Sequence, residues 1–328
     1  ITYIQISLID QKLHPFYPMM LMSLIEFAIV GLWANIFQWL YRKMFPPKKL
    51  LLVYGNRPAF HLRDKINSRE DKYFLEDAVH VSIGEDEIMK MAVRYDAIII
   101  GDVPAHERNL LMKLCFEESI RTYSVPKISD ILIRTSTELD IFDSPLLLSR
   151  NEGLQIEQRF IKRLMDVSFS ILGLVITSPF FAVIAVIIKC TDRGPVFYRQ
   201  NRLTQDGRVF SICKFRTMVQ DAEKDTGARL ASDNDDRVLP VGKFLRRTRL
   251  DELPQLWNIL KGEMSVVGPR PERPELAEKI EEEIPEFHYR LKVKAGLTGF
   301  AQIYGKYNTS SYDKLKLDLS YIRKYSVF

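Results

Sequence analysis

The chain is poor in the residues that build metal clusters and disulfide frameworks. Its 328 residues include three cysteines and five histidines. The cysteines form no CxxC pair and the histidines form no HExxH pattern, so neither a zinc site nor a set of structural disulfides is expected. The sequence also lacks a GxGxxG motif, which argues against the usual mode of dinucleotide binding. No internal repeat or cleavable signal peptide is visible.

Charge of one sign is not in large excess either. Lysine and arginine number 47 against 42 aspartate and glutamate, which gives a formal net charge of +5. This mild excess excludes neither a membrane surface nor a phosphate-bearing ligand. A chain of this length is expected to form about two domains, each with its own core.

Apolar residues are concentrated in two long segments. The first, residues 18–41, carries Glu26 as its only charge and is long enough to cross ~30 Å of hydrocarbon. Arg42 and Lys43 follow immediately, so the positive-inside rule puts this end in the cytoplasm. We therefore expect residues 1–47 to be a transmembrane region that continues N-terminal to this sequence, which does not begin with methionine. A buried core helix is the alternative.

The second apolar segment, residues 167–188, is interrupted by Ser178-Pro179 and has basic residues on both flanks. The positive-inside rule therefore makes both ends cytoplasmic. A proline removes one backbone donor and favours a kink, and the Ser178 hydroxyl can bond a carbonyl that the kink frees. We predict a re-entrant membrane helix over 164–189 that enters, bends and returns to the same face. A straight span with a modest kink is the alternative.

Residues 48–143 alternate strand-like and helix-like stretches, which predicts a small parallel α/β domain. The strand-like runs are 50–54, 97–100 and 121–125, and the helix-like runs are 87–95 and 104–119. The first turn has a single glycine, Gly55, so a structural or oligomerisation role suits this domain better than dinucleotide binding. Residues 144–158 are expected to be a linker.

Beyond residue 195 the chain is polar and mixed. Two β-rich runs around the turn 205–208 predict a hairpin. Residues 256–260 predict a helix that ends at Gly262. Near the end, three apolar residues fall at helical spacing beside basic ones and fit either a membrane-surface helix or a core-facing helix; they are Leu315, Leu319 and Ile322.

Two adjacent carboxylates, Asp251 and Glu252, are the most informative feature. Pro254 follows them, and proline is best tolerated in the first turn of a helix, so the pair is expected at or just before a helix start. One carboxylate can attack phosphorus while its neighbour holds a divalent cation. Aspartate, with the shorter side chain, suits the nucleophile, and glutamate can reach Mg²⁺. An acidic turn that only complements a helix dipole is the alternative.

Cationic groups accompany the pair. The guanidinium group of arginine can donate two hydrogen bonds to one phosphate group. A basic patch can also bind anionic lipid. The basic residues before the carboxylates are Lys243, Arg246, Arg247 and Arg249. Lys214 and Arg216 flank a phenylalanine, and two prolines fix the backbone around Arg270, which suits a rigid ligand contact or a plain turn. Together these patterns predict a site for phosphoryl transfer.

These motifs together resemble the bacterial sugar transferase family, the monotopic polyprenol-phosphate phosphoglycosyl transferases. The resemblance covers about residues 159–325 and rests on Lys162-Arg163 with Asp166, Ser178-Pro179, Gly194-Pro195-Val196-Phe197, Lys214-Phe215-Arg216-Thr217-Met218, Leu250-Asp251-Glu252-Leu253-Pro254-Gln255, Gly262-Glu263-Met264-Ser265-Val266-Val267-Gly268-Pro269-Arg270-Pro271 and Gly296-Leu297-Thr298-Gly299-Phe300-Ala301-Gln302. The preceding part resembles the family's large subgroup. This implies a degenerate Rossmann-like domain over 48–143 and a mixed α/β catalytic domain over 159–328.

The resemblance implies a two-step displacement in which Asp251 attacks the β-phosphate of a UDP-sugar, UMP leaves, and polyprenol phosphate takes up the phosphosugar. Glu252 would hold Mg²⁺ and Arg246 would support the phosphates. The implied substrate-binding residues are Lys214, Arg216, Pro269, Arg270 and Pro271, with the last three bordering the uridine. The implied partners are a UDP-sugar, polyprenol phosphate, the lipid bilayer and a second copy of the chain, with no nucleic acid.

The implied setting is the bacterial inner membrane, with the active site on its cytoplasmic face, at the first membrane step of exopolysaccharide or O-antigen-type glycan assembly. Two positions depart from the family's pattern: Thr204 stands where a glycine is usual, and Ala295 stands where a proline is usual. The competing hypotheses are a non-enzymatic membrane scaffold and an NAD-dependent enzyme that uses the α/β domain.

Overall fold

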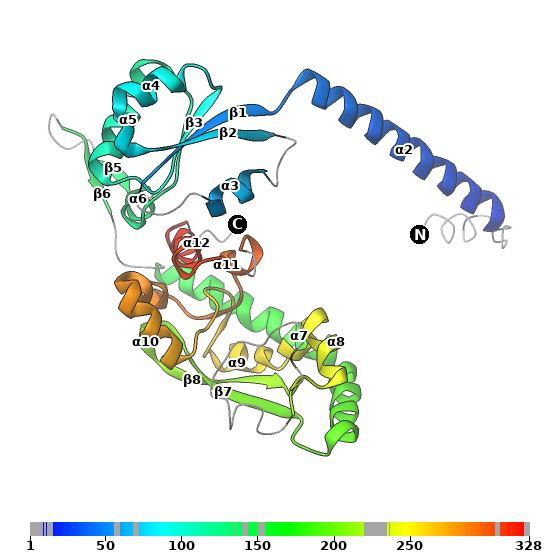
Figure 1. Ribbon diagram of the computed structural model, residues 1–328. Coiled ribbons are helices and arrows are strands. Elements are labelled where there is room, and N and C mark those ends of the chain that lie inside the picture. Colours follow the sequence, from blue (N-terminus) through cyan, green and yellow to red (C-terminus); the bar gives the residue numbers. More distant parts are fainter. Residues whose placement is uncertain are drawn as a thin grey trace. The chain divides into compact units, whose positions relative to one another are not determined.

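The computed structural model describes residues 9, 11, 16–55, 60–67, 72–134, 136–139, 144–149, 155–219, 235, 237–305 and 309–324. Residues 1–8 of the predicted transmembrane region and 150–154 of the predicted linker lie outside this set. The chain divides into two compact units, Ile1–Val125 and Pro126–Phe328, and each unit has its own apolar cores. Figure 1 shows the elements of both.

The first unit begins with helix α2 (Phe16–Met44), which contains the predicted apolar segment. It is long and apolar enough to cross a membrane. Arg42 and Lys43 fall in its last turn, and none of its residues is buried. A core helix would bury at least one face, so this exposure fits the predicted membrane segment better than the alternative.

The rest of the first unit is a four-stranded parallel sheet in the order β2-β1-β3-β4. The strands are β1 (Lys48–Tyr54), β2 (Tyr73–His80), β3 (Ala97–Ile100) and β4 (Thr122–Ser124). Alternate residues of β1 and β3 belong to two different cores, one on each face. Helices α4 (Glu85–Ala92) and α5 (Ala105–Glu117) cover one face and α3 (Phe60–Asn67) covers the other (Figure 1). The predicted parallel α/β fold is confirmed.

The second unit is a mixed α/β assembly. Its strands are the antiparallel pair β5 (Thr137–Leu139) and β6 (Leu146–Leu148), the predicted hairpin β7 (Phe197–Leu203) and β8 (Val209–Phe215), and the parallel pair β9 (Ser265–Val267) and β10 (Gly296–Thr298). Its α-helices are α6 (Ile128–Ile133), α7 (Ile156–Asp192), α8 (Pro240–Thr248), α9 (Gln255–Lys261), α10 (Pro274–Glu283), α11 (Phe300–Ile303) and α12 (Ser311–Arg323). Its 3-10 helices are the short turns η2 (Gln205–Gly207) and η3 (Leu250–Glu252) and the longer η4 (Pro285–Lys292).

Helix α12 faces a core rather than a membrane surface. Leu315, Leu319 and Ile322 are buried and share one cluster with residues of α10 and η4. Ile128 and Ile131 of α6 belong to the same cluster. The structure therefore groups α6, which lies within the predicted 48–143 domain, with the second unit.

Helix α7 runs for 37 residues and includes the whole predicted re-entrant segment, with Pro179 inside it. Proline has no N–H to give to the carbonyl of Val175, four residues earlier. Ser178 Oγ donates to that carbonyl at 2.8 Å, which is the predicted hydroxyl bond. Figure 1 shows the green ribbon of α7 changing direction along its length. The helix is the second one that is long and apolar enough to cross a membrane.

Candidate active site

The two carboxylates lie on the short turn η3, between α8 and α9. Arg249, just before the turn, has φ of 57°, a left-handed conformation that ends α8 and reverses the chain. Pro254 directly precedes α9, so the pair does lie at a helix start. Leu250 and Leu253 pack against a core that includes Phe215 and Leu245. This packing anchors the turn from both sides of the pair.

Glu252 is held by two cations. Lys214 Nζ, near the end of β8, and Arg270 Nη2 each lie 3.1 Å from Glu252 Oε1. Burial raises the pKa of Glu252, but Lys214 and Arg270 outweigh it, so the pKa falls below its ordinary value. The carboxylate is therefore ionised at neutral pH. Both cations contact Oε1, which leaves Oε2 for a further ligand.

Asp251 has a different environment. Its side chain is buried, with 8% of the residue exposed. Burial raises the pKa of Asp251, while the charges of Lys214 and Arg246 oppose that rise. A desolvated carboxylate beside cations is suited to attack an electron-poor phosphorus atom. Arg246 Nε donates to Thr217 Oγ1 at 2.9 Å, which fixes that arginine.

Lys214 joins the two carboxylates electrostatically. Burial lowers the pKa of Lys214, Glu252 raises it, and Arg270 lowers it further. The ammonium group is thus shared between a direct ion pair with Glu252 and a longer-range interaction with Asp251. The sequence predicted Lys214 as a substrate-binding residue, and the fold brings it to the carboxylate pair.

Arg216 lies in a different setting. Its side chain is buried, and its guanidinium group packs so closely on Gly194 that a Cβ at position 194 would collide with it. Its backbone N–H donates to Val196 O at 2.9 Å. These contacts hold residues 194–196, which lead into strand β7, against the end of strand β8. Its predicted contact with substrate stays a prediction.

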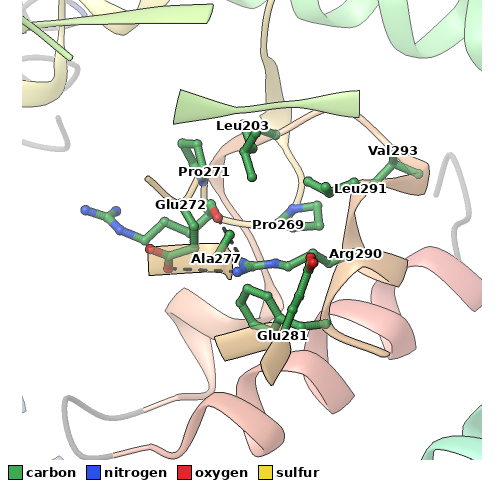
Figure 2. Close-up of a pocket in the computed structure, with 12 residues that line it drawn as sticks. Leu203, Pro269, Pro271, Glu272, Ala277, Glu281, Arg290, Leu291 and Val293 are labelled. Atoms are coloured by element: carbon green, nitrogen blue, oxygen red, sulfur yellow. Dashed lines mark hydrogen bonds and ion pairs between the residues drawn. The ribbon is translucent and has the colours of Figure 1, made fainter. Parts of the chain in front are cut away.

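The loop Pro269–Pro271 forms one wall of a small cavity. Figure 2 shows Arg290 reaching across this cavity toward Glu272. Arg290 Nη2 lies 2.8 Å from Asp318 Oδ2 and donates to the Arg270 carbonyl at 2.9 Å. The buried ion pair thus fixes the backbone of the residue whose side chain holds Glu252. Sequence reasoning missed both Arg290 and Asp318, because no motif links them to the carboxylates.

A second small cavity has Glu252 in its lining. It is lined by Arg202, Ile212, Lys214, Glu252, Gln255, Arg270, Pro271 and Gly296. Three of these residues are basic and one is acidic. Such a lining suits an anionic ligand with polar substituents.

The two departures from the family's pattern contact each other beneath this region. Thr204 Oγ1 donates to the Glu263 carbonyl at 2.8 Å and accepts from the N–H of Ala295 at 3.2 Å. Thr204 and Ala295 are both buried. The hydroxyl therefore joins the start of the loop that carries Arg270 to the segment that leads into β10.

The donor set fits a magnesium ion better than a metal cluster. Among the residues that the structure describes, no three histidine, cysteine, aspartate or glutamate side chains come together. Mg²⁺ in phosphoryl-transfer sites commonly takes one or two carboxylates and completes its shell with substrate phosphate and water. Glu252, the predicted metal ligand, would supply one such carboxylate through Oε2.

Comparison with known proteins identifies the family. A family model described as "Bacterial sugar transferase" matches residues 157–328, which is more than half of the chain. The chain belongs to the bacterial sugar transferase family. This confirms the resemblance that the motifs carry, and the matched region begins at the start of α7 and includes both carboxylates.

Curated relatives of this bacterial sugar transferase have names that state a common chemistry. The UDP-N-acetylgalactosamine-undecaprenyl-phosphate N-acetylgalactosaminephosphotransferase of Aeromonas hydrophila is 36% identical over 243 residues, which cover 72% of this chain and 56% of the relative. The UDP-glucose:undecaprenyl-phosphate glucose-1-phosphate transferase of Klebsiella pneumoniae is 44% identical over 238 residues, 71% of this chain and 49% of the relative. The chain thus spans about half the length of these two relatives.

A further relative is more similar over a shorter stretch. The putative undecaprenyl-phosphate N-acetylgalactosaminyl 1-phosphate transferase of Bacillus subtilis is 50% identical over 131 residues, which cover 40% of this chain and 73% of the relative. The named sugars differ among these relatives, so membership of the family leaves the sugar open.

Proposed function

We propose that this protein transfers a phosphosugar from a UDP-sugar to polyprenol phosphate, releasing UMP. The observation that carries the proposal is the pairing of a buried carboxylate, Asp251, with a neighbour, Glu252, that Lys214 and Arg270 hold ionised. The names of the relatives, which specify transfer of a sugar phosphate to undecaprenyl phosphate, support the same reaction.

In the first step a carboxylate oxygen of Asp251 attacks the β-phosphorus of the UDP-sugar. A bond forms between that oxygen and phosphorus, and the bond from phosphorus to the oxygen bridging the two phosphates breaks. The bridging oxygen leaves with the electron pair as part of UMP. Lys214, Arg246 and Arg270 offset the negative charge of the phosphates, which otherwise repels the attacking carboxylate.

In the second step a phosphate oxygen of polyprenol phosphate attacks the same phosphorus atom. The acyl-phosphate bond breaks, its electron pair returns to Asp251, and the product is a polyprenyl diphosphate sugar. Splitting one displacement into two lets a water-soluble donor and a lipid acceptor use the same carboxylate in turn. Glu252 would hold Mg²⁺, which supplies additional positive charge to the phosphates when bound.

The membrane arrangement belongs to the proposal. Helix α7 would act as a re-entrant hairpin that keeps the active site at the level of the lipid headgroups, on the cytoplasmic face of the bacterial inner membrane. The exposed apolar side chains of α7 and the bond from Ser178 to the Val175 carbonyl support this arrangement. The α/β domain would be Rossmann-like and serve dimerisation, and the reaction would begin exopolysaccharide or O-antigen-type glycan assembly.

The proposal is tested with Asp251→Asn. We expect turnover of a UDP-sugar with polyprenol phosphate and Mg²⁺, followed as UMP release, to fall by about three orders of magnitude or more, as for other nucleophile deletions. A panel of UDP-sugars identifies the preferred donor. Near-normal turnover would refute the role of Asp251.

Asp206→Asn is the matched control, because Asp206 is exposed in the η2 turn with φ of 56°, a conformation that asparagine also adopts. This control is expected to keep wild-type activity. Trapping with a donor labelled at the β-phosphate should give an adduct on the wild-type chain and none on Asp251→Asn.

A further inference from the structure

Two residues that line the cavity beside Glu252 each carry a buried side-chain N–H that has no acceptor among the residues that the structure describes. One is the amide Nε2 of Gln255, the first residue of α9, and the other is Nε of Arg202, in β7. Gln255 is 3% exposed. Both residues line the same cavity as Lys214 and Arg270.

A buried donor without an acceptor is costly. Burying one such group destabilises a protein by ~1–3 kcal/mol, and native proteins contain few of them. The residue after Gln255, Leu256, packs into a core, so an apolar side chain at 255 could also pack without this cost. The amide is therefore better explained by an acceptor that comes from outside the chain.

Arg202 is held in the cavity wall by its other nitrogens. Nη1 donates to the Pro271 carbonyl at 3.3 Å and Nη2 to Gln200 Oε1 at 2.8 Å. Burial lowers the pKa of Arg202, and Glu272 opposes this change. The guanidinium group is thus fixed through Nη1 and Nη2, while its buried Nε has no acceptor among the described residues.

The charge of the lining indicates which part of the ligand meets each donor. Phosphate oxygens are best met by the cations Lys214 and Arg270, which converge on Glu252. Gln255 is neutral, and a neutral amide suits a hydroxyl or carbonyl oxygen. A nucleotide sugar carries such oxygens on its sugar and also on its ribose and uracil. The sugar is joined directly to the β-phosphate, which Asp251 would attack, so its oxygens are the ones expected nearest to Glu252.

We propose that Gln255 and Arg202 bind the phosphosugar part of the nucleotide sugar, with the Gln255 amide donating to a neutral oxygen of the sugar. This inference rests on the proposed function, since it takes a UDP-sugar as the ligand. It makes Gln255 a residue that contributes to sugar recognition.

The test is equilibrium binding to the full chain in lipid nanodiscs, in an Asp251→Asn background so that no turnover consumes the ligand. UMP, UDP, UDP-glucose and UDP-N-acetylgalactosamine are compared with and without Gln255→Met. We expect the Kd of at least one UDP-sugar to rise about 2- to 10-fold, which corresponds to one neutral hydrogen bond. The Kd values of UMP and UDP are expected to stay unchanged.

Thermal unfolding without ligand provides a second readout. Because Gln255→Met removes an unpaired donor, the unfolding midpoint is expected to stay the same or rise. A role confined to the fold would lower it. Gln205→Met is the matched control and should alter no Kd, since Gln205 is only partly buried, is not among the residues that line this cavity, and donates from Nε2 to the Lys292 carbonyl. Gln255→Leu takes the place of Gln255→Met if the latter does not fold.

Three outcomes overturn the inference: unchanged UDP-sugar affinity, equal weakening of UMP and UDP-sugar, or a lowered midpoint. Unchanged affinity would mean that water satisfies the amide. Failure of the parent chain to bind any UDP-sugar would overturn the proposed function as well, and the parent measurement identifies that case. Residual activity of Asp251→Asn would refute the nucleophile alone, because the binding comparison does not depend on it.

Discussion

Two neighbouring carboxylates in one turn have opposite electrostatic environments. Burial raises the pKa of Asp251, whereas Lys214 and Arg270 together hold the pKa of Glu252 below its ordinary value. Environments that push the pKa values of adjacent groups apart are typical of sites where the groups have different roles. A rigid turn achieves this separation, because α8 and α9 direct one side chain inward and let the other meet two cations.

Lys214→Met is expected to move the acidic limb of the pH–activity profile to higher pH. The charge of Lys214 lowers the pKa of Asp251, so its removal raises that pKa further. Asp251 must be ionised to attack, and activity is lost as pH falls through its pKa. The measurement is kcat/KM for UDP-sugar between about pH 4 and pH 8. Lys214→Arg keeps the charge and should leave the acidic limb of the profile at the wild-type pH. An acidic limb that does not move in Lys214→Met would contradict the assignment of this limb to Asp251.

Asp318 predicts a pH dependence of stability. Burial raises the pKa of Asp318 from 3.8 to about 6, and the ion pair with Arg290 only partly offsets it. The folded-state pKa exceeds the unfolded one, so its stabilising contribution is complete below pH 3.8 and is lost as pH rises through about 6.

Thermal unfolding of wild type and Asp318→Asn, compared at several pH values, measures this contribution. The stability of wild type relative to Asp318→Asn should fall between about pH 4 and pH 6, by on the order of 3 kcal/mol. Parallel curves for the two proteins would show that Asp318 titrates normally.

At the scale of elements, patterns that a single element determines were predictable. Strands β1 and β3 are buried on both faces and read as continuous apolar runs. Strand β2 was missed because it lies at the sheet edge and has only Leu75 buried among charged neighbours. The spacing in α12 fitted two environments, and only contacts with α10 and η4 decide for the core.

In the candidate active site, too, some features could be predicted from local motifs and others depend on the whole fold. The motifs identified Asp251, Glu252, Lys214 and Arg270 as a group, yet the contacts among them join residues 38 and 18 positions apart. Such distances are set by the fold of the whole unit. The unpaired donors of Gln255 and Arg202 could not be predicted, because a donor is unpaired only in relation to everything around it.

Helix α7 carries the prediction about topology. The native Cys190 is exposed near its C-terminal end, and Gln158→Cys places a thiol near its N-terminal end. If the helix is re-entrant, a membrane-impermeant maleimide should label both sites from the same side. Labelling from opposite sides would indicate an ordinary span. Each site is tested in a chain that lacks the other cysteines.

Pro179→Leu restores an N–H that can bond the Val175 carbonyl and straighten the helix. In this variant the label at Cys190 is expected to become accessible from the opposite side. Ser178→Ala removes only the hydroxyl bond and should keep the wild-type labelling pattern, because the proline still prevents a straight helix.

At the scale of the whole molecule, the proposed arrangement would attach the second unit to the membrane through α7, independently of α2. A fragment of residues 126–328 is expected to sediment with membranes and to resist extraction by high salt, since the apolar side chains of α7 remain exposed. Release of this fragment into solution would contradict direct attachment through α7.

The same unit is expected to need α6. A fragment of residues 144–328 lacks Ile128 and Ile131, which are buried in the core with α12, and the bond from Arg323 to the Leu132 carbonyl. Loss of two buried isoleucines should destabilise the fragment by roughly 2–5 kcal/mol relative to 126–328. Equal unfolding midpoints of the two fragments would mean that α6 contributes little.

The contact between Thr204 and the N–H of Ala295 constrains how this chain diverged from its relatives. The δ-carbon of a proline at 295 would occupy the position of the amide proton, which points at the threonine oxygen. A threonine at 204 and a proline at 295 therefore exclude each other. A glycine at 204 is compatible with a proline at 295, and a threonine at 204 is compatible with an alanine at 295. If the glycine–proline pair is ancestral, the proline was replaced first and the threonine followed, so an intermediate sequence carried an unpaired amide that the threonine later satisfied.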